Sequence, residues 1–181
     1  FHPWGATTDD IERCDRLVFD LDPDVALAWP EVVAAARQLR GYLRQAGLES
    51  FVRTSGGKGL HLVVPLSPAV PWHQARDFAQ AVADAAREAE PLRYVATASK
   101  RLRKGKIFID WLRNGRGATS VASFSARARR GAPVAMPLRW EELGRVAGGD
   151  AYDIRNTPAR LKRLKSHPWH GMEALRQSLP E

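Results

Sequence analysis

The chain has 181 residues and a single cysteine, Cys14, so it cannot form an internal disulfide. One thiol in a chain of this length fits a reducing compartment, and its neighbours do not mark it as reactive. No apolar stretch approaches the roughly 20 residues of a membrane-spanning helix, and the first residues lack the basic and apolar regions of a signal peptide. The sequence therefore predicts a cytoplasmic protein with no membrane partner.

Internal repeats are absent, as are low-complexity segments long enough to act as linkers, so we expect one domain with one core. A hydrophobic fraction of 44% and a charged fraction of 27% are those of a folded chain. The chain opens with Phe1 in what reads as a structured segment, and we expect it to be a fragment or one module of a longer protein.

Acidic residues are scarce in the stretch 93–130, where Asp110 is the only one among many lysines and arginines. The whole chain carries a formal net charge of +8. A basic balance by itself is often only a solvated surface, but a carboxylate embedded in basic sequence indicates a site that gathers phosphates and metal together.

Three acidic residues follow apolar runs that read as strands: Asp20 and Asp22 in the segment 17–23, and Asp110 in the segment 106–111. Because side chains alternate along a strand, Asp20 and Asp22 share a face, and a third carboxylate from a neighbouring strand could complete a site for a divalent cation. Such a site is typical of phosphoryl or nucleotidyl transfer. The alternatives are carboxylates that cap turns, or a buried pair of Asp110 with an arginine.

The segment 55–61, Ser-Gly-Gly-Lys-Gly-Leu-His, is the most specific loop signal. Its glycines allow backbone N–H groups to approach an anion, while Lys58 supplies charge and Ser55 and His61 supply hydrogen bonds. It lies between two strands and has the wrong spacing for a Walker A loop. We predict phosphate binding here, against the alternative of an ordinary glycine-rich hairpin.

Arg127 and Arg129 alternate along a stretch expected to be extended and could point to the same phosphates, in competition with a role as solvated surface arginines. His2 could contact a nucleotide or simply pack beside Trp4. The other histidines outside the glycine segment lack metal-ligand spacing.

The order of expected elements is strand, helix, strand, strand, helix, strand. The helices are expected from Pro30 to Ala46, ended by Gly47, and over 72–89, and the strands over 49–54 and 60–65 form a hairpin. This order predicts an α+β fold of ferredoxin-like or RNA-recognition type, with helices on one sheet face and the carboxylates on the open face. Further helices are expected to open at Pro137 and, with Thr157 as N-cap, at Pro158, and the tail is expected to be helical and basic.

Four motifs occur in order: residues 18–23 (VFDLDP), 54–61 (TSGGKGLH), 106–110 (KIFID) and 114–119 (NGRGAT). Together they resemble the polymerase domain of bacterial DNA ligase D, a family of the archaeo-eukaryotic primase superfamily that fills gaps and extends broken ends in non-homologous end joining. The resemblance covers nearly the whole chain. It implies a primase-polymerase catalytic core with an RNA-recognition-like sheet, acting as a template-directed nucleotidyltransferase on DNA ends.

Carried over to this chain, the resemblance makes Asp20, Asp22 and Asp110 the catalytic ligands of two divalent ions, manganese or magnesium. The residues implied to contact the incoming NTP or dNTP are His2, Ser55, Lys58, His61, Arg127 and Arg129. A Ku-type end-binding protein and a ligase module, fused or in trans, are the implied partners, at the bacterial nucleoid.

The family domain normally has about another hundred residues before the equivalent of Phe1, a typical module's worth of chain. Residues 1–181 are therefore expected to be the C-terminal catalytic portion of such a domain. Two alternatives stay open. The chain could bind DNA ends without catalysis, as an accessory or relic. Less favoured is a haloacid-dehalogenase-like phosphatase with Asp20 as nucleophile, because Asp24 stands where that motif has Thr or Val.

Overall fold

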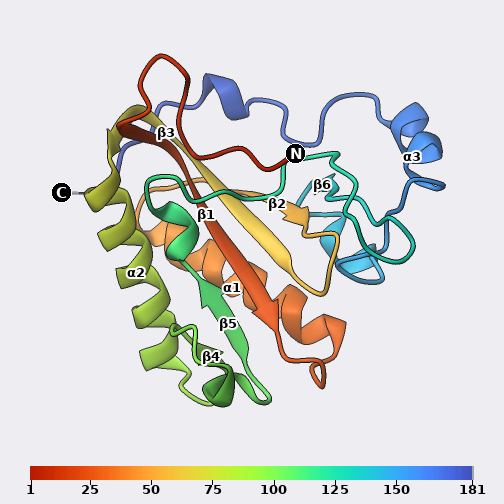
Figure 1. Ribbon diagram of the computed structural model, residues 1–181, viewed down its shortest axis with the longest axis horizontal. Coiled ribbons are helices and arrows are strands. Elements are labelled where there is room, and N and C mark those ends of the chain that lie inside the picture. The colour runs from red at the N-terminus through yellow and green to blue at the C-terminus, as the bar shows by residue number, and fades with distance from the viewer. Residues whose placement is uncertain (181) are drawn as a thin grey trace.

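The computed structural model describes residues 1–180, which fold into a mixed sheet with two long helices on one face (Figure 1). The strands are β1 (Arg13–Pro23), β2 (Phe51–Thr54), β3 (Leu60–Pro71), β4 (Tyr94–Val95), β5 (Ile107–Asp110) and β6 (Pro137–Leu138). The α-helices are α1 (Trp29–Gln45), α2 (Trp72–Ala89) and α3 (Thr157–Arg163). Over residues 1–180, no helix is long and apolar enough to cross a membrane.

The strands lie in the order β4-β5-β1-β3-β2-β6. Neighbouring strands are antiparallel, except β4 and β5, which are parallel. β1 therefore lies between β3 and β5, with β2 outside β3, which is the split arrangement expected from the sequence. The α+β class and the hairpin of β2 and β3 are confirmed, and the six expected elements occur in the expected order, with the short β4 as an unpredicted strand between α2 and β5.

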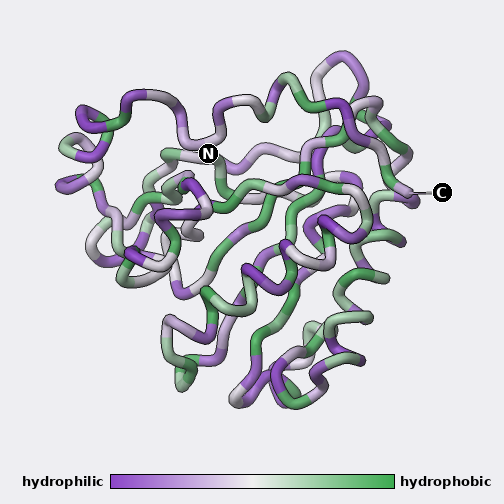
Figure 2. Tube along the Cα trace, turned by 180° about the vertical axis from the view of Figure 1, so that it is seen from behind, coloured by the Kyte–Doolittle hydropathy of each residue, from purple (hydrophilic) through white to green (hydrophobic). Residues whose placement is uncertain are grey.

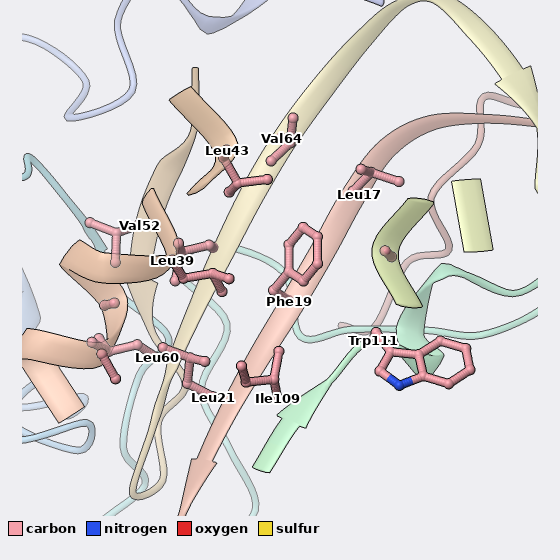
Figure 3. Packing of buried hydrophobic residues seen from close by; sticks show 14 of the residues in the cluster. Leu17, Phe19, Leu21, Leu39, Leu43, Val52, Leu60, Val64, Ile109 and Trp111 are labelled. Carbon is pink, nitrogen blue, oxygen red and sulfur yellow. The ribbon is translucent and has the colours of Figure 1, made fainter. Parts of the chain in front are cut away.

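Side chains of β1 alternate between the two faces of the sheet. Leu17, Phe19 and Leu21 are fully buried and project into the core between the sheet and the helices, where Figure 3 shows Phe19 and Leu21 near Leu39 of α1. Hydrophobic residues follow the central strands, while the outer loops are largely hydrophilic (Figure 2). The intervening residues of β1 project from the opposite face, so the core positions of this strand determine where its carboxylates lie.

Helix α1 begins as the sequence predicts, with Pro30 in its first turn. The Glu31 carboxylate accepts a hydrogen bond of 2.8 Å from the Ala28 backbone N–H, which satisfies a donor that the helix leaves free. Gly47 follows the helix with a φ of 76°, a left-handed conformation that favours glycine. The second helix occupies the predicted residues 72–89.

Strand β3 continues past its predicted end at Pro65 to Pro71. β2 pairs with β3 only as far as Val63, so no β2 partner is needed in the later segment, where the prolines lie. Prolines lack the N–H that a second neighbouring strand would require.

Three expectations for the last third of the chain are wrong. Pro137 opens β6 instead of a helix, because Pro137 and Leu138 pair with β2 and extend the sheet. The N-cap of α3 is Asn156, and Thr157 is already its first helical residue. After α3 the described chain is mostly irregular, with one short 3₁₀ turn at Met172–Ala174.

The sheet face opposite α1 and α2 is only partly open. Trp169 packs on Val18 and Val63 of this face and donates a hydrogen bond of 3.0 Å from Nε1 to the Val52 carbonyl. The irregular tail is held there by apolar contact, which its basic composition does not reveal. The carboxylates lie next to this covered patch.

Candidate active site

Four polar residues form a row across four strands on the face opposite the helices. Asp110 of β5 lies directly opposite Asp20 of β1, Asp20 opposite His61 of β3, and His61 opposite Arg53 of β2. We call these four residues the polar row. Directly opposed residues on antiparallel strands have neighbouring side chains, so the register of the sheet brings the four together.

The Arg113 guanidinium contacts the two carboxylates at one end of the polar row. Its Nε lies 3.1 Å from Asp110 Oδ2, and its Nη2 lies 3.7 Å from Asp20 Oδ2. Burial raises the pKa of Asp110, an effect that Arg113 opposes and Asp20 reinforces. Burial also acts to raise the pKa of Asp20, but the contact with His61 and the charges of Arg113 and Arg127 outweigh it, so that pKa is lowered.

Asp22 lies on the same face, one step further along β1. Its carboxylate accepts a hydrogen bond of 3.1 Å from Arg103 Nη1. The Arg103 guanidinium also stacks over Phe108, 3.8 Å from the centre of the ring, and Phe108 is the residue opposite Asp22 on β5. Arg103 thus covers this end of the carboxylate face through one charged and one aromatic contact.

Asn114 fixes the turn that carries Arg113. Its side chain accepts a hydrogen bond of 2.7 Å from the Val18 N–H and donates to the Val18 carbonyl at 3.0 Å, as a neighbouring strand would. It also donates to the Trp111 carbonyl at 2.8 Å. Because Asn114 is buried, these bonds hold the 3₁₀ turn Leu112–Asn114 against β1 beside the carboxylates.

The donor set suits a hard divalent cation, since carboxylate oxygens are what Mg²⁺ and Mn²⁺ prefer. The positively charged guanidinium group of Arg113 already contacts both Asp20 and Asp110. Across residues 1–180, however, no group of three His, Cys, Asp or Glu side chains converges closely enough to hold a metal ion. The residues fit a metal in type and in shared face, and the metal site stays a prediction.

The glycine-rich segment forms the turn between β2 and β3. Several of its backbone N–H groups already donate hydrogen bonds within the protein. Ser55 Oγ accepts bonds from the N–H groups of Gly57 and Gly59, at 3.1 and 3.2 Å. The Gly56 N–H donates to the Gly149 carbonyl at 2.9 Å. These three amides therefore shape the turn and do not form the free anion nest that we expected, while the Lys58 side chain is exposed.

Arg127 and Arg129 both approach this turn, but not through the strand alternation that we expected, and their contact with phosphates stays a prediction. The Arg129 N–H bonds to the Arg127 carbonyl at 2.8 Å, so the backbone turns here. Arg127 Nη1 donates to the Ser55 carbonyl at 2.6 Å. Arg129 Nη1 lies beside Gly57, where an added Cβ would meet it at 2.8 Å. Two guanidinium groups and Lys58 thus surround the turn with positive charge.

The two candidate histidines differ in exposure. His2 is exposed, and slight burial followed by the charges of Arg127 and Arg113 lowers its pKa, which places it beside the basic side of the site. His61 is 3% exposed, and its two ring nitrogens face Arg53 and Asp20. Nucleotide contact by either residue stays a prediction.

Sequence reasoning missed four residues of this site: Arg53, Arg103, Arg113 and Asn114. Arg103 and Arg113 lie in the basic stretch 93–130, where composition could not single them out. One signal was available, because Arg53 precedes the motif 54–61 on a strand whose alternation places it on the face away from Val52 and Thr54.

A split α+β sheet with aspartates on the face opposite its helices, beside a basic glycine turn, defines the class of primase-polymerase domains. Comparison with protein families agrees: the family described as "LigD, primase-polymerase domain" matches residues 1–169. The chain belongs to the LigD primase-polymerase domain family, which confirms the resemblance drawn from the four motifs.

Relatives of known name extend this comparison. The multifunctional non-homologous end joining protein LigD of Pseudomonas aeruginosa is 43% identical over 99% of this chain and 21% of its own length. The bifunctional protein of the same name from Bacillus subtilis is 33% identical over 83% of this chain and 25% of its own length. The chain therefore spans about a fifth to a quarter of these two relatives.

A solved structure described as the polymerase domain from Mycobacterium tuberculosis ligase D in complex with DNA matches with a TM-score of 0.81. The identity is 34%, and the match covers 91% of this chain and 57% of that one. The fold of this chain is therefore that of a LigD polymerase domain.

Proposed function

We propose that this chain is a template-directed nucleotidyltransferase that fills gaps and extends DNA ends in non-homologous end joining. The observation that carries the proposal is the opposed pair Asp20 and Asp110, with Asp22 on the same face and a basic turn adjacent. The names of the relatives and the DNA complex of the solved neighbour support the same role.

Asp20, Asp22 and Asp110 would hold two divalent ions, with manganese or magnesium as the candidates. The chemistry that such ions would supply is a lowered pKa of a primer 3′-hydroxyl and neutralisation of charge on the triphosphate and the leaving pyrophosphate. Arg113 and Arg103 contact Oδ2 of these carboxylates, so a metal ion that used the same oxygens would compete with both guanidinium groups. In the metal-free chain Arg113 lowers the pKa of Asp20 and opposes the effect of burial on the pKa of Asp110.

The basic turn would bind the triphosphate of an NTP or dNTP. Lys58, Arg127 and Arg129 supply positive charge that offsets the charge developing on the phosphates. Ser55 orders the turn through its bonds to Gly57 and Gly59, and its carbonyl orients Arg127. His2 and His61 would add hydrogen bonds from the two sides of the site.

The proposed substrate is a DNA end, either gapped or with a 3′ overhang, and the net charge of +8 favours such a polyanion. A Ku-type end-binding protein and a ligase module, fused or in trans, are the proposed partners. The proposed place of action is the bacterial nucleoid.

The test is extension of a labelled, gapped duplex with a 5′-phosphate, with manganese and separate rNTP and dNTP pools. Asp110→Ala should reduce extension at least about 100-fold, because it removes one of the proposed ligands of the metal ions that would stabilise charge in the transition state. Asp77→Ala removes an exposed carboxylate on α2 and should leave extension unchanged. DNA binding without extension by the parent chain, unchanged in Asp110→Ala, would instead favour a non-catalytic end-binding role.

A further inference from the structure

The polar row ends in an arginine without a carboxylate partner. Arg53 is 6% exposed, and among residues 1–180 no acidic side chain lies within 4.0 Å of its guanidinium nitrogens. Burial lowers the pKa of Arg53 to about 10, so the group is still charged at neutral pH. A buried charge is costly unless its donors are used, so the position requires an explanation.

The donors of Arg53 meet a ring nitrogen. Nε and Nη2 each lie 3.3 Å from His61 Nδ1, and Nη2 also donates to Ser120 Oγ at 3.1 Å. A guanidinium group can only donate hydrogen bonds, so Nδ1 must accept with its lone pair. The proton of a neutral His61 then lies on Nε2, which is 3.5 Å from Asp20 Oδ1.

We propose that Arg53 is a positioning residue that fixes His61 as the Nε2–H tautomer, in which the Nε2–H group is directed toward Asp20. In the metal-free chain Nε2 of His61 faces Asp20 Oδ1, while the other oxygen of this carboxylate, Oδ2, faces Arg113. The other tautomer would turn a lone pair toward the carboxylate and a proton toward the guanidinium, two repulsive contacts at once. In known metal sites, residues that hydrogen-bond to a ligand fix the tautomer and the orientation of that ligand.

The surroundings of Arg53 hold its guanidinium in place. Ser120 anchors Nη2, and the guanidinium carbon lies 5.8 Å from the centre of the Trp169 ring. Trp169 is itself bonded to the Val52 carbonyl, next to Arg53 in the chain. The covered patch of the sheet therefore supports the tautomer of His61, a role that the motif 54–61 alone does not suggest.

The first arm of the test needs no metal, substrate or activity. Long-range ¹H–¹⁵N correlation spectra of histidine-labelled protein report which ring nitrogen of His61 is protonated. The wild-type chain should show Nε2–H, and Arg53→Met, which keeps a long apolar stem, should shift the population toward Nδ1–H. Arg53→Lys keeps a charged group that can only donate and should restore Nε2–H, while Arg13→Met, at an exposed arginine that bonds to the Ala69 carbonyl, should leave the tautomer unchanged.

The second arm rests on the proposed function and measures Mn²⁺ affinity by electron paramagnetic resonance of the free ion. Arg53→Met should weaken binding about tenfold, as loss of an outer partner commonly does, and Arg53→Lys should recover most of it. An Nδ1–H tautomer in the wild-type chain overturns the inference without any variant, as does an unchanged tautomer in Arg53→Met. If the tautomer responds as expected but the wild-type chain neither binds Mn²⁺ nor extends DNA, the proposed function fails and the positioning role stands.

Discussion

Asp20 and Asp110 are directly opposed on β1 and β5, and one guanidinium, that of Arg113, contacts both carboxylates. Two like charges at this separation would repel each other and favour protonation of one. Arg113 opposes this effect at both carboxyl groups, although burial still leaves the pKa of Asp110 raised. A divalent cation bound to the same two oxygens would compete with Arg113.

Replacing Arg113 by Gln should therefore make the fold more dependent on metal. Without metal, we expect the variant to lose about 1 kcal/mol of stability, or about 2–4 °C in Tm, because the carboxylates repel each other unopposed. With Mn²⁺ in excess the deficit should shrink, since a ligand stabilises the state that binds it. Thermal unfolding with and without Mn²⁺ measures both stability losses.

Arg116→Gln, which removes an exposed ion pair with Glu12, is the control. A loss of stability in Arg113→Gln that is the same with and without Mn²⁺ would contradict the prediction.

Removing positive charge from the glycine turn should weaken nucleotide binding. We expect Lys58→Gln and Arg129→Gln each to raise the dissociation constant for an NTP about five- to tenfold, the loss of one charge-assisted contact. Titration with a fluorescent nucleotide measures this. Arg130→Gln is a matched control on the neighbouring exposed residue. Equal loss for a nucleoside without phosphates would argue against contact with the triphosphate.

Gly59 should not tolerate a side chain. A Cβ at this position would lie 1.8 Å from the Leu21 carbonyl oxygen, and β1 cannot withdraw without moving Asp20 and Asp22. We expect Gly59→Ala to cost about 3 kcal/mol in the free energy of unfolding. Gly41→Ala in α1 meets no atom within 4 Å and should stabilise by about 0.5–1 kcal/mol. Urea unfolding of both variants tests the contrast, and a stable Gly59→Ala chain would show that the turn can shift.

The buried thiol of Cys14 should make stability fall at alkaline pH. Burial raises its pKa from 9.0 to about 11, and its Sγ–H donates to the Arg16 carbonyl at 3.0 Å. The folded state holds the proton more tightly than the unfolded state, so this contribution is complete below pH 9 and is lost as the pH rises toward 11. The loss is at most about 2–3 kcal/mol.

Cys14→Ala lacks this ionisation, so the stability difference between wild type and variant should decrease between pH 9 and 11. Urea unfolding across that range measures the difference. The phenol of Tyr94, whose pKa burial raises to about 12, acts in the same direction at higher pH but is present in both chains. A difference that does not change with pH would mean that the thiol ionises equally in both states.

The sequence predicted those parts of the fold that depend on local periodicity. The alternation of Leu17, Phe19 and Leu21 was sufficient to place Asp20 and Asp22 on the opposite face, and the apolar spacing of α2 predicted its bounds. Strand β6 was missed because two residues carry no periodic pattern, and it forms only because β2 offers it a free edge.

The site was predicted less completely than the fold. Its carboxylates belong to recognisable strands, but Arg103 and Arg113 reach them from 3₁₀ turns whose positions depend on tertiary contacts. The partnership of Arg53 and His61 depends on the register of β2 and β3. Register is set by the packing of the whole sheet and cannot be read from either strand by itself.

The polar row draws one residue from each of four strands that are separated along the chain. A slip of β1 by a single residue would turn both of its carboxylates into the core and bring Leu21 to the surface. The site therefore depends on the register of β1 as well as on which strands have paired. During refolding, appearance of the complete row would mark correct pairing of the four strands from β5 to β2, and a proteolytic cut that frees β5 would remove Asp110 from it.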